Sequence, residues 1–123
     1  MRNILFVVFI LCLLAGCAKT GPALNFWTEE CNDDINPYSQ PSAGILNKTW
    51  EQENIFVADG YVKTFCGGAE ILPDYLIEGD NLTLKYKLVI GDTVTSCMCA
   101  HKVIYEFSNL EHKEYVVSII RQY

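Results

Sequence analysis

The clearest pattern in the chain is an alternation of hydrophobic and polar residues between positions 82 and 90. Every second residue is hydrophobic there, and these residues are Leu82, Leu84, Tyr86, Leu88 and Ile90. Polar residues lie between them, namely Thr83, Lys85 and Lys87. Because successive side chains of a strand point to opposite faces, the pattern predicts a β-strand with one buried face.

Other segments show the same period of two. A second strand is expected over residues 95–107, where Cys97, Cys99, His101, Val103, Tyr105 and Phe107 share one face, and a last strand over 115–120. Segments 54–58 and 61–66 flank Asp59-Gly60, a pair that favours a two-residue turn, so they predict a hairpin. A short edge strand is expected over residues 74–78, after Pro73.

These elements indicate the fold class. Six or seven short strands without a helical hydrophobic spacing predict an all-β body, either a small sandwich or an open barrel, over residues 50–123. Residues 17–49 contain three prolines and little periodicity, so we expect a tether and an irregular leader. Residues 17–123 number 107, which suits a single domain.

One local motif narrows the architecture. The segment Tyr105 to Ile119, with the sequence YEFSNLEHKEYVVSI, resembles the E–F corner of immunoglobulin-like and fibronectin type III domains. The resemblance implies that Leu110 packs into the core and that Tyr115 hydrogen-bonds back to the corner. The chain departs from that family because it reaches Tyr123 without room for a following strand. Either the sheet lacks this strand, or the topology is permuted, or the corner is coincidental.

The amino-terminal segment has the order of a secretory signal peptide. A short basic start precedes an uncharged run of 11 residues, Ile4 to Leu14, and the small residues Ala15 and Gly16 follow. As a helix this run is about 16 Å long, roughly half of the ~30 Å hydrocarbon core. We therefore expect a signal-peptide helix over residues 1–16 that does not remain as a membrane span.

The residue after this run changes the prediction. Leu14-Ala15-Gly16-Cys17 resembles the lipobox of bacterial lipoproteins, which implies cleavage before Cys17 and acylation of its sulfur and amine. Two acyl chains give stable anchoring to a lipid bilayer. Ala18, where an aspartate is associated with inner-membrane retention, favours the outer membrane. The arrangement is also similar to small lipoproteins of Bacteroidota, which implies a cell-envelope β domain and supplies no catalytic residue.

The charge distribution restricts the partners. The chain carries a formal charge of −6, and its basic residues are scattered. Nucleic acid is not expected as a partner, because no basic cluster would contact phosphates. The excess of acidic residues also disfavours attachment through anionic headgroups.

Four cysteines remain once Cys12 leaves with the signal peptide and Cys17 is acylated. They are Cys31, Cys66, Cys97 and Cys99, and an even number in an exported domain predicts two disulfides. Cys97 and Cys99 lie about 6.7 Å apart along a strand, too far to pair with each other. Each should reach Cys31 or Cys66, and the spacing leaves the order open.

A metal site is the main alternative for part of this set. Cys97, Cys99 and His101 on one strand face could hold Cu(I) or Zn²⁺, with His112 as a fourth ligand. Disulfides are the favoured interpretation, because thiolates in an exported protein must survive oxidation. The acidic segment 29–34 could hold Ca²⁺ but lacks a known loop pattern, so a solvated turn is favoured.

The sequence does not predict an enzyme. Redox enzymes of the thioredoxin type use Cys-x-x-Cys at a helix start, and no Gly-x-Ser-x-Gly motif is present. No catalytic residue or cofactor is assigned. We expect an anchored lipoprotein whose β domain is a binding or structural module, with metal handling, or inhibition or glycan binding, as alternatives. Trp27 and Trp50 could line a ligand face, although packing is the favoured role.

Overall fold

The computed structural model describes residues 21–123, which form seven β-strands. The predicted signal peptide and Cys17 therefore lie outside the described residues. The strands are β1 (Ala23–Cys31), β2 (Ala43–Gln52), β3 (Ile55–Phe65), β4 (Ala69–Glu78), β5 (Asn81–Ile90), β6 (Met98–Ser108) and β7 (Val116–Gln122). The described part of the chain contains no helix, so the predicted all-β class is confirmed.

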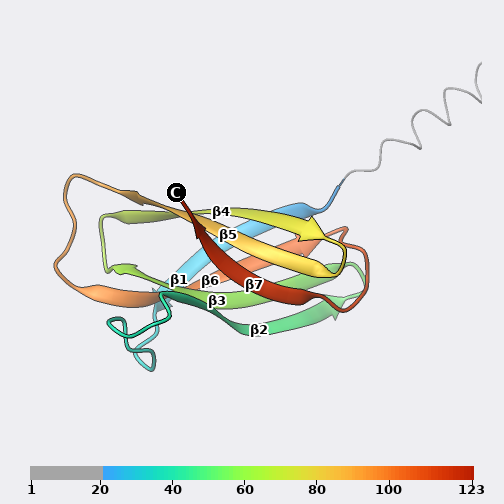
Figure 1. The fold of residues 1–123 in the computed structure, drawn as a ribbon, viewed down its shortest axis with the longest axis horizontal. Coiled ribbons are helices and arrows are strands. Elements are labelled where there is room, and N and C mark those ends of the chain that lie inside the picture. The colour runs from blue at the N-terminus through green and yellow to red at the C-terminus, as the bar shows by residue number, and fades with distance from the viewer. Residues whose placement is uncertain (1–20) are drawn as a thin grey trace, which may run out of the picture.

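The strands form two sheets that pack face to face as a small sandwich (Figure 1). One sheet has the order β1-β6-β3-β2 and is antiparallel throughout. The other has the order β4-β5-β7, in which β4 and β5 are antiparallel and β5 and β7 are parallel. The two sheets are not closed into a barrel.

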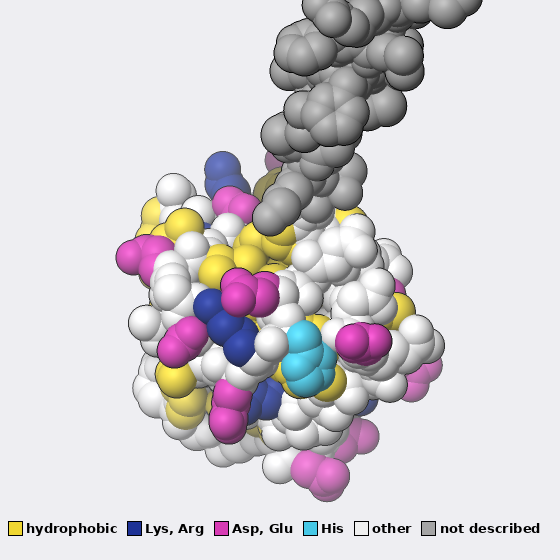
Figure 2. Space-filling view, turned by 90° about the vertical axis from the view of Figure 1, so that its right-hand side faces the viewer, with side chains coloured by type: hydrophobic (Ala, Val, Ile, Leu, Met, Phe, Trp, Pro, Cys, Tyr) yellow, Lys and Arg dark blue, Asp and Glu magenta, His cyan; other side chains and the backbone are white. Residues whose placement is uncertain are grey.

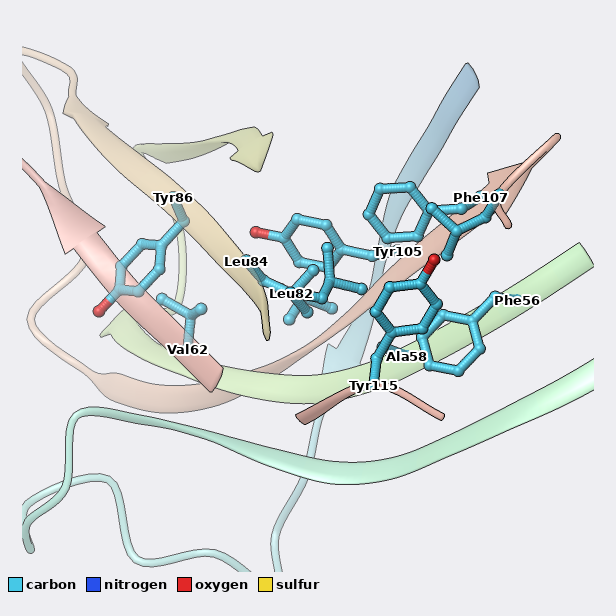
Figure 3. Close-up of a cluster of buried hydrophobic side chains, with 11 residues drawn as sticks. Phe56, Ala58, Val62, Leu82, Leu84, Tyr86, Tyr105, Phe107 and Tyr115 are labelled. Atoms are coloured by element: carbon cyan, nitrogen blue, oxygen red, sulfur yellow. The ribbon is translucent and has the colours of Figure 1, made fainter. Parts of the chain in front are cut away.

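The core lies between the sheets and follows the predicted alternation. From β5 it receives Leu82, Leu84 and Tyr86, and from β6 it receives Val103, Tyr105 and Phe107. Figure 3 shows the labelled side chains of β5, β6 and β3 pointing toward one another from the two sheets. Burial of such side chains contributes about 1.5–3 kcal/mol each, which makes this layer the main source of stability.

The predicted hairpin around Asp59-Gly60 is wrong. Both residues lie inside β3, which runs without a break, and the turn between β2 and β3 falls at residues 53–54. Gly60 is a glycine for a different reason, since a Cβ atom there would collide with the carbonyl oxygen of Gly44 on β2. A close approach of two strands therefore produced the sequence signal of a turn.

The prediction of an irregular leader up to residue 49 is also wrong in part. Strands β1 and β2 belong to the four-stranded sheet, where they occupy its two edges. Their hydrophobic period is weak because most of their side chains are only half buried or exposed. The connection between them, residues 32–42, is irregular and covers Lys63, whose ammonium group donates hydrogen bonds to the Ser39 carbonyl (2.7 Å) and hydroxyl (3.2 Å).

The connection from β6 to β7 crosses from one sheet to the other. Tyr115 donates a hydrogen bond to the carbonyl of Glu111 at 2.7 Å, and Leu110 is buried in the core. This is the local geometry that the corner motif implied. Beyond it, β7 pairs with β5 in parallel, which differs from the antiparallel sheets of immunoglobulin domains.

The predicted edge strand over residues 74–78 is longer than expected. It is β4, an edge strand of the three-stranded sheet, and Pro73 lies within it. An edge strand tolerates proline because a residue there can leave its missing N–H on the unpaired side.

Candidate functional site

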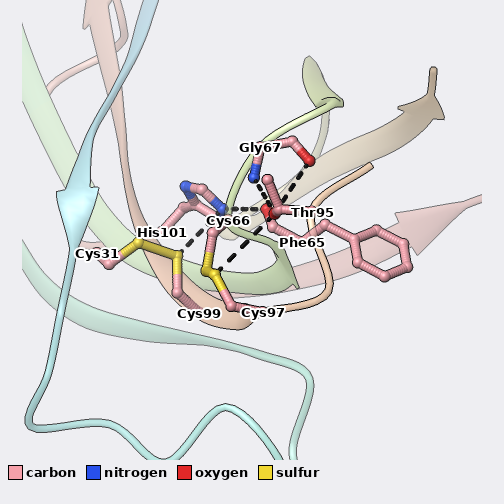
Figure 4. Close-up of a disulfide and its surroundings, with 8 residues drawn as sticks. All are labelled: Cys31, Phe65, Cys66, Gly67, Thr95, Cys97, Cys99 and His101. Carbon is pink, nitrogen blue, oxygen red and sulfur yellow. Dashed lines mark hydrogen bonds between the residues drawn. A yellow bond between two sulfur atoms is a disulfide. The ribbon is translucent and has the colours of Figure 1, made fainter. Parts of the chain in front are cut away.

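Two disulfides lie together at the end of the sandwich where β1 ends and β6 begins (Figure 4). Cys31 pairs with Cys99 and Cys66 pairs with Cys97, with Cα–Cα distances of 5.6 and 5.5 Å. Cys97, just before β6, and Cys99, on β6, thus bond to different distant cysteines, as predicted. The tertiary structure decides the order that the spacing had left open.

The backbone pairing places Cys31, Cys99 and His101 at one point. Cys31 is the last residue of β1 and lies opposite His101 in the β1–β6 ladder. The register of that ladder shifts between Thr28 and Cys31, so a bulge sets the position of the cysteine. Cys99 and His101 are two residues apart on β6 and share a face.

The imidazole of His101 lies against the Cys31–Cys99 disulfide. Its Nε2 atom is 2.8 Å from the carbonyl oxygen of Phe65 and 3.2 Å from Sγ of Cys99. A carbonyl oxygen can only accept a hydrogen bond, so Nε2 carries the proton and donates it. The same N–H is within reach of the sulfur, as the dashed lines in Figure 4 show.

The structure assembles a different set of potential ligands from the predicted one. Cys97 is bonded to Cys66, and His112 lies on the β6–β7 connection, where its ring stacks on Trp50 at 4.3 Å. Ligand atoms of Cys31, Cys99 and His101 instead lie within 4.8 Å of one another. Sequence reasoning did not include Cys31 in this set of potential ligands, because only the β1–β6 pairing brings it to His101.

A cleft of about 400 Å³ opens beside His101, between the edges of the two sheets. Its walls come from β1 and β4 and include Trp27, Thr28 and Glu70. Trp27 is 38 % exposed, so it presents part of its ring to solvent instead of filling the core. Figure 1 shows β1 and β4 as neighbouring edges of the two sheets.

A larger cleft, about 510 Å³, lies at the opposite end, away from the cysteines. Trp50 lines it, packs against Phe56 with ring centroids 5.0 Å apart, and donates from its indole N–H to the carbonyl of Lys113 at 3.0 Å. Trp50 therefore acts mainly as a packing anchor. Figure 2 shows the end that carries the β6–β7 connection, where acidic and basic side chains and a histidine lie among scattered hydrophobic side chains.

The two lysines that line this cleft already have partners. Lys113 lies 3.2 Å from an oxygen of Asp80, and this hydrogen bond raises the pKa of the lysine. Lys48 donates to the carbonyl of Tyr115. Burial raises the pKa of the Tyr115 hydroxyl, which keeps it neutral and able to donate. These lysines hold the corner in place, which leaves them less free to bind an anion.

The acidic segment 29–34 spans the end of β1 and the exposed turn that follows it. The side-chain oxygen of Asn32 accepts a hydrogen bond from the backbone N–H of Asp34 at 3.0 Å. Glu29 lies 3.6 Å from the ammonium group of Lys102. The residues after Cys31 form the favoured solvated turn, whereas Glu29 and Glu30 belong to β1.

Comparison with known proteins assigns the chain to no family. No family model, curated protein or solved structure matches the chain. Among residues 21–123, no helix is long and apolar enough to cross a membrane. The most distinctive chemistry in the described residues is the disulfide of Cys31 and Cys99 with an imidazole beside it.

Proposed function

We propose that the protein is a lipid-anchored component of a bacterial cell envelope whose β-sandwich serves as a binding or structural module. The observation that carries the proposal is Leu14-Ala15-Gly16-Cys17 at the end of an uncharged hydrophobic run. Acyl chains on Cys17 would hold the body at a bilayer surface without a membrane-spanning segment. Ala18 favours the outer membrane as that surface.

The disulfides of the body support this location. Structural disulfides persist in oxidising compartments such as the bacterial periplasm and cell surface. The described domain contains two of them, and each joins segments distant in sequence. An exported domain of about this size gains a large part of its net stability from such bonds, at roughly 2–4 kcal/mol each.

The start of the body limits its distance from the anchor. Pro22 already contacts the sandwich, since its carbonyl accepts a hydrogen bond from the Tyr75 hydroxyl at 3.1 Å. Five Cα–Cα steps separate Cys17 from Pro22, so the linker reaches about 18 Å at most. The end of the sandwich where β1 begins, next to the β6–β7 connection, would face the membrane (Figure 1). The disulfide end would point away from it.

Membrane fractionation of Cys17→Ser tests the anchor. The parent protein should remain with membranes after a carbonate wash, whereas Cys17→Ser should move to the soluble fraction. Cys12→Ser is the matched control, because it alters a cysteine inside the hydrophobic run and should leave attachment unchanged. The intact mass of the parent should show acyl chains and begin at residue 17.

Two results would contradict the proposal. One is a Cys17→Ser protein that resists the carbonate wash as firmly as the parent. The other is a mature parent protein whose mass contains no acyl chain.

A further inference from the structure

The group formed by Cys31, Cys99 and His101 offers more than a structural disulfide. Two sulfur atoms and one imidazole nitrogen lie within 4.8 Å of one another, close to the spacing that a single bound ion requires. Figure 4 shows the His101 ring directed at the sulfur of Cys99 from the same strand. Cleavage of the disulfide would thus leave two soft thiolate ligands beside an imidazole.

We propose that reduction of the Cys31–Cys99 disulfide converts this group into a binding site for Cu(I). A dithiol supplies two electrons and two protons, becoming a disulfide itself, and leaves thiols on Cys31 and Cys99. Cu(I) then displaces both thiol protons and binds two thiolates and the imidazole. The disulfide and the metal site are therefore alternative states of the same residues.

The number and type of ligands favour Cu(I) over Zn²⁺. Thiolates are soft ligands that select Cu(I), and imidazole also suits copper. Structural zinc sites almost always have four ligands, whereas this group of described residues contains three. His112, the other histidine of the chain, stacks on Trp50 at the opposite end of the sandwich and does not complete the set.

Backbone pairing holds the ligands independently of the sulfur–sulfur bond. Cys31 is paired with His101 across β1 and β6, and Cys99 with Thr64 across β6 and β3. Next to the site, the N–H of Asn32 donates to the carbonyl of Ala100 at 2.8 Å. These contacts keep β1 beside β6 after reduction, so the ligands remain close together.

The imidazole can change partner without a change in charge. Nε2 now donates to the Phe65 carbonyl, and a shift of the ring proton to Nδ1 frees Nε2 for the metal. Cys31 is exposed, and His101 lines the cleft between β1 and β4. A dithiol and a copper ion can therefore approach the site from solvent.

The second disulfide provides an internal comparison. The polar side chain near Cys97 is Thr95, whose hydroxyl lies 4.0 Å from the sulfur, and a hydroxyl is a poor ligand for soft metals. The same chain thus contains one disulfide with an adjacent imidazole and one with a hydroxyl. Reduction should create a copper site at the first alone.

The test measures Cu(I) transfer from its bicinchoninate complex to the full chain in detergent. Cys12→Ser and Cys17→Ser are present throughout, so only the four body cysteines react and the result does not depend on lipid anchoring. After reduction with dithiothreitol and desalting without oxygen, the protein should take up one equivalent of Cu(I). The oxidised protein should take up none.

Variants assign the ligands. Cys31→Ser with Cys99→Ser should lose the bound equivalent, whereas Cys66→Ser with Cys97→Ser should retain it. His101→Asn should raise the dissociation constant about tenfold or more, since loss of even an outer contact to a metal ligand costs about 10–100-fold. His112→Asn is its matched control and should bind like the parent.

Circular dichroism and a urea control separate this site from binding by an unfolded chain. The reduced protein should keep the β spectrum of the oxidised form, and urea should abolish the difference between His101→Asn and His112→Asn. The proposal fails if His101→Asn binds Cu(I) like the parent, or if the Cys31 and Cys99 variant retains the ion. It also fails if reduction removes the β spectrum, or if the folded reduced protein binds no Cu(I).

Discussion

At the scale of single residues, the hydroxyl groups of two buried tyrosines donate hydrogen bonds to backbone carbonyls. Tyr115 donates to Glu111 within the corner, and Tyr105 on β6 donates to Lys85 on β5 at 2.7 Å. The second bond joins the two sheets directly through the core. Each ring also contributes hydrophobic burial, so a change to phenylalanine isolates the effect of the hydroxyl.

We expect Tyr115→Phe to lower the free energy of unfolding by about 1 kcal/mol, the usual net value of one hydrogen bond. Urea denaturation followed by circular dichroism measures this change. Tyr38→Phe is the matched control, because Tyr38 is 75 % exposed and should contribute close to nothing. Equal stabilities of Tyr115→Phe and the parent would show that the corner bond is dispensable.

The stability should fall at alkaline pH because of the same tyrosines. Burial, with smaller contributions from Tyr86 and Asp74, raises the pKa of Tyr105 well above its ordinary value of 10. A raised pKa in the folded state means that the contribution is complete below about pH 10 and is lost as the pH rises further. Above that pH, each such group lowers the free energy of unfolding by up to about 1.4 kcal/mol per pH unit.

Tyr105→Phe should therefore show a shallower loss of stability than the parent above about pH 10. Urea denaturation at a series of pH values measures the slope. Tyr38→Phe should keep the slope of the parent. A slope for Tyr105→Phe that equals that of the parent would mean that Tyr105 ionises as easily in the folded protein as in the unfolded chain.

At the scale of elements, close approach between strands explains residues that local propensity misassigns. Gly60 lies in the middle of β3, opposite Ile45 of β2 and beside the Gly44 carbonyl. The Tyr61 ring packs over Gly44 in the same region. The β2–β3 pairing therefore depends on two small residues, and a methyl group has no space at position 60.

Gly60→Ala should destabilise the protein by about 1–3 kcal/mol, the range for overpacking, because the backbone of β2 must move. Thermal unfolding monitored by circular dichroism provides the measurement. Gly21→Ala is the control, since nothing lies within 4 Å of a Cβ atom there. If the two variants melt at the same temperature, β2 does not approach β3 as closely as described.

At the scale of the whole molecule, the two disulfides close loops of different length. Cys31 and Cys99 are 68 residues apart, and Cys66 and Cys97 are 31 residues apart. The longer loop includes most of the sandwich and ties the edge strand β1 to the centre of its sheet. The shorter loop connects the end of β3 with the entry to β6.

Loop-closure entropy predicts about 4.4 kcal/mol for the longer loop and about 3.7 kcal/mol for the shorter one. Replacing Cys31 and Cys99 by serine should therefore reduce stability more than replacing Cys66 and Cys97, by about 0.7 kcal/mol. Urea denaturation of both double variants measures the difference. The opposite ranking would indicate that native packing, and not the length of the closed loop, determines the stabilisation.

The sequence by itself determined the strands in which one set of alternating side chains is buried and the other faces solvent. The alternation in β5 and β6 separates core from solvent, and the corner residues Leu110 and Tyr115 act within a few positions of each other. The number of disulfides and the exclusion of a Cys97–Cys99 bond also followed from composition and strand geometry. All of these depend on local spacing, which a sequence records directly.

Only the tertiary structure decided which distant residues meet. It recruited β1 and β2 as edge strands despite their weak patterns, and it placed Gly60 inside a strand because of a neighbouring backbone. It also paired Cys31 with Cys99 and brought both to His101. The physical reason is that strand pairing is non-local, so the partner of each strand depends on how the two sheets together bury the core.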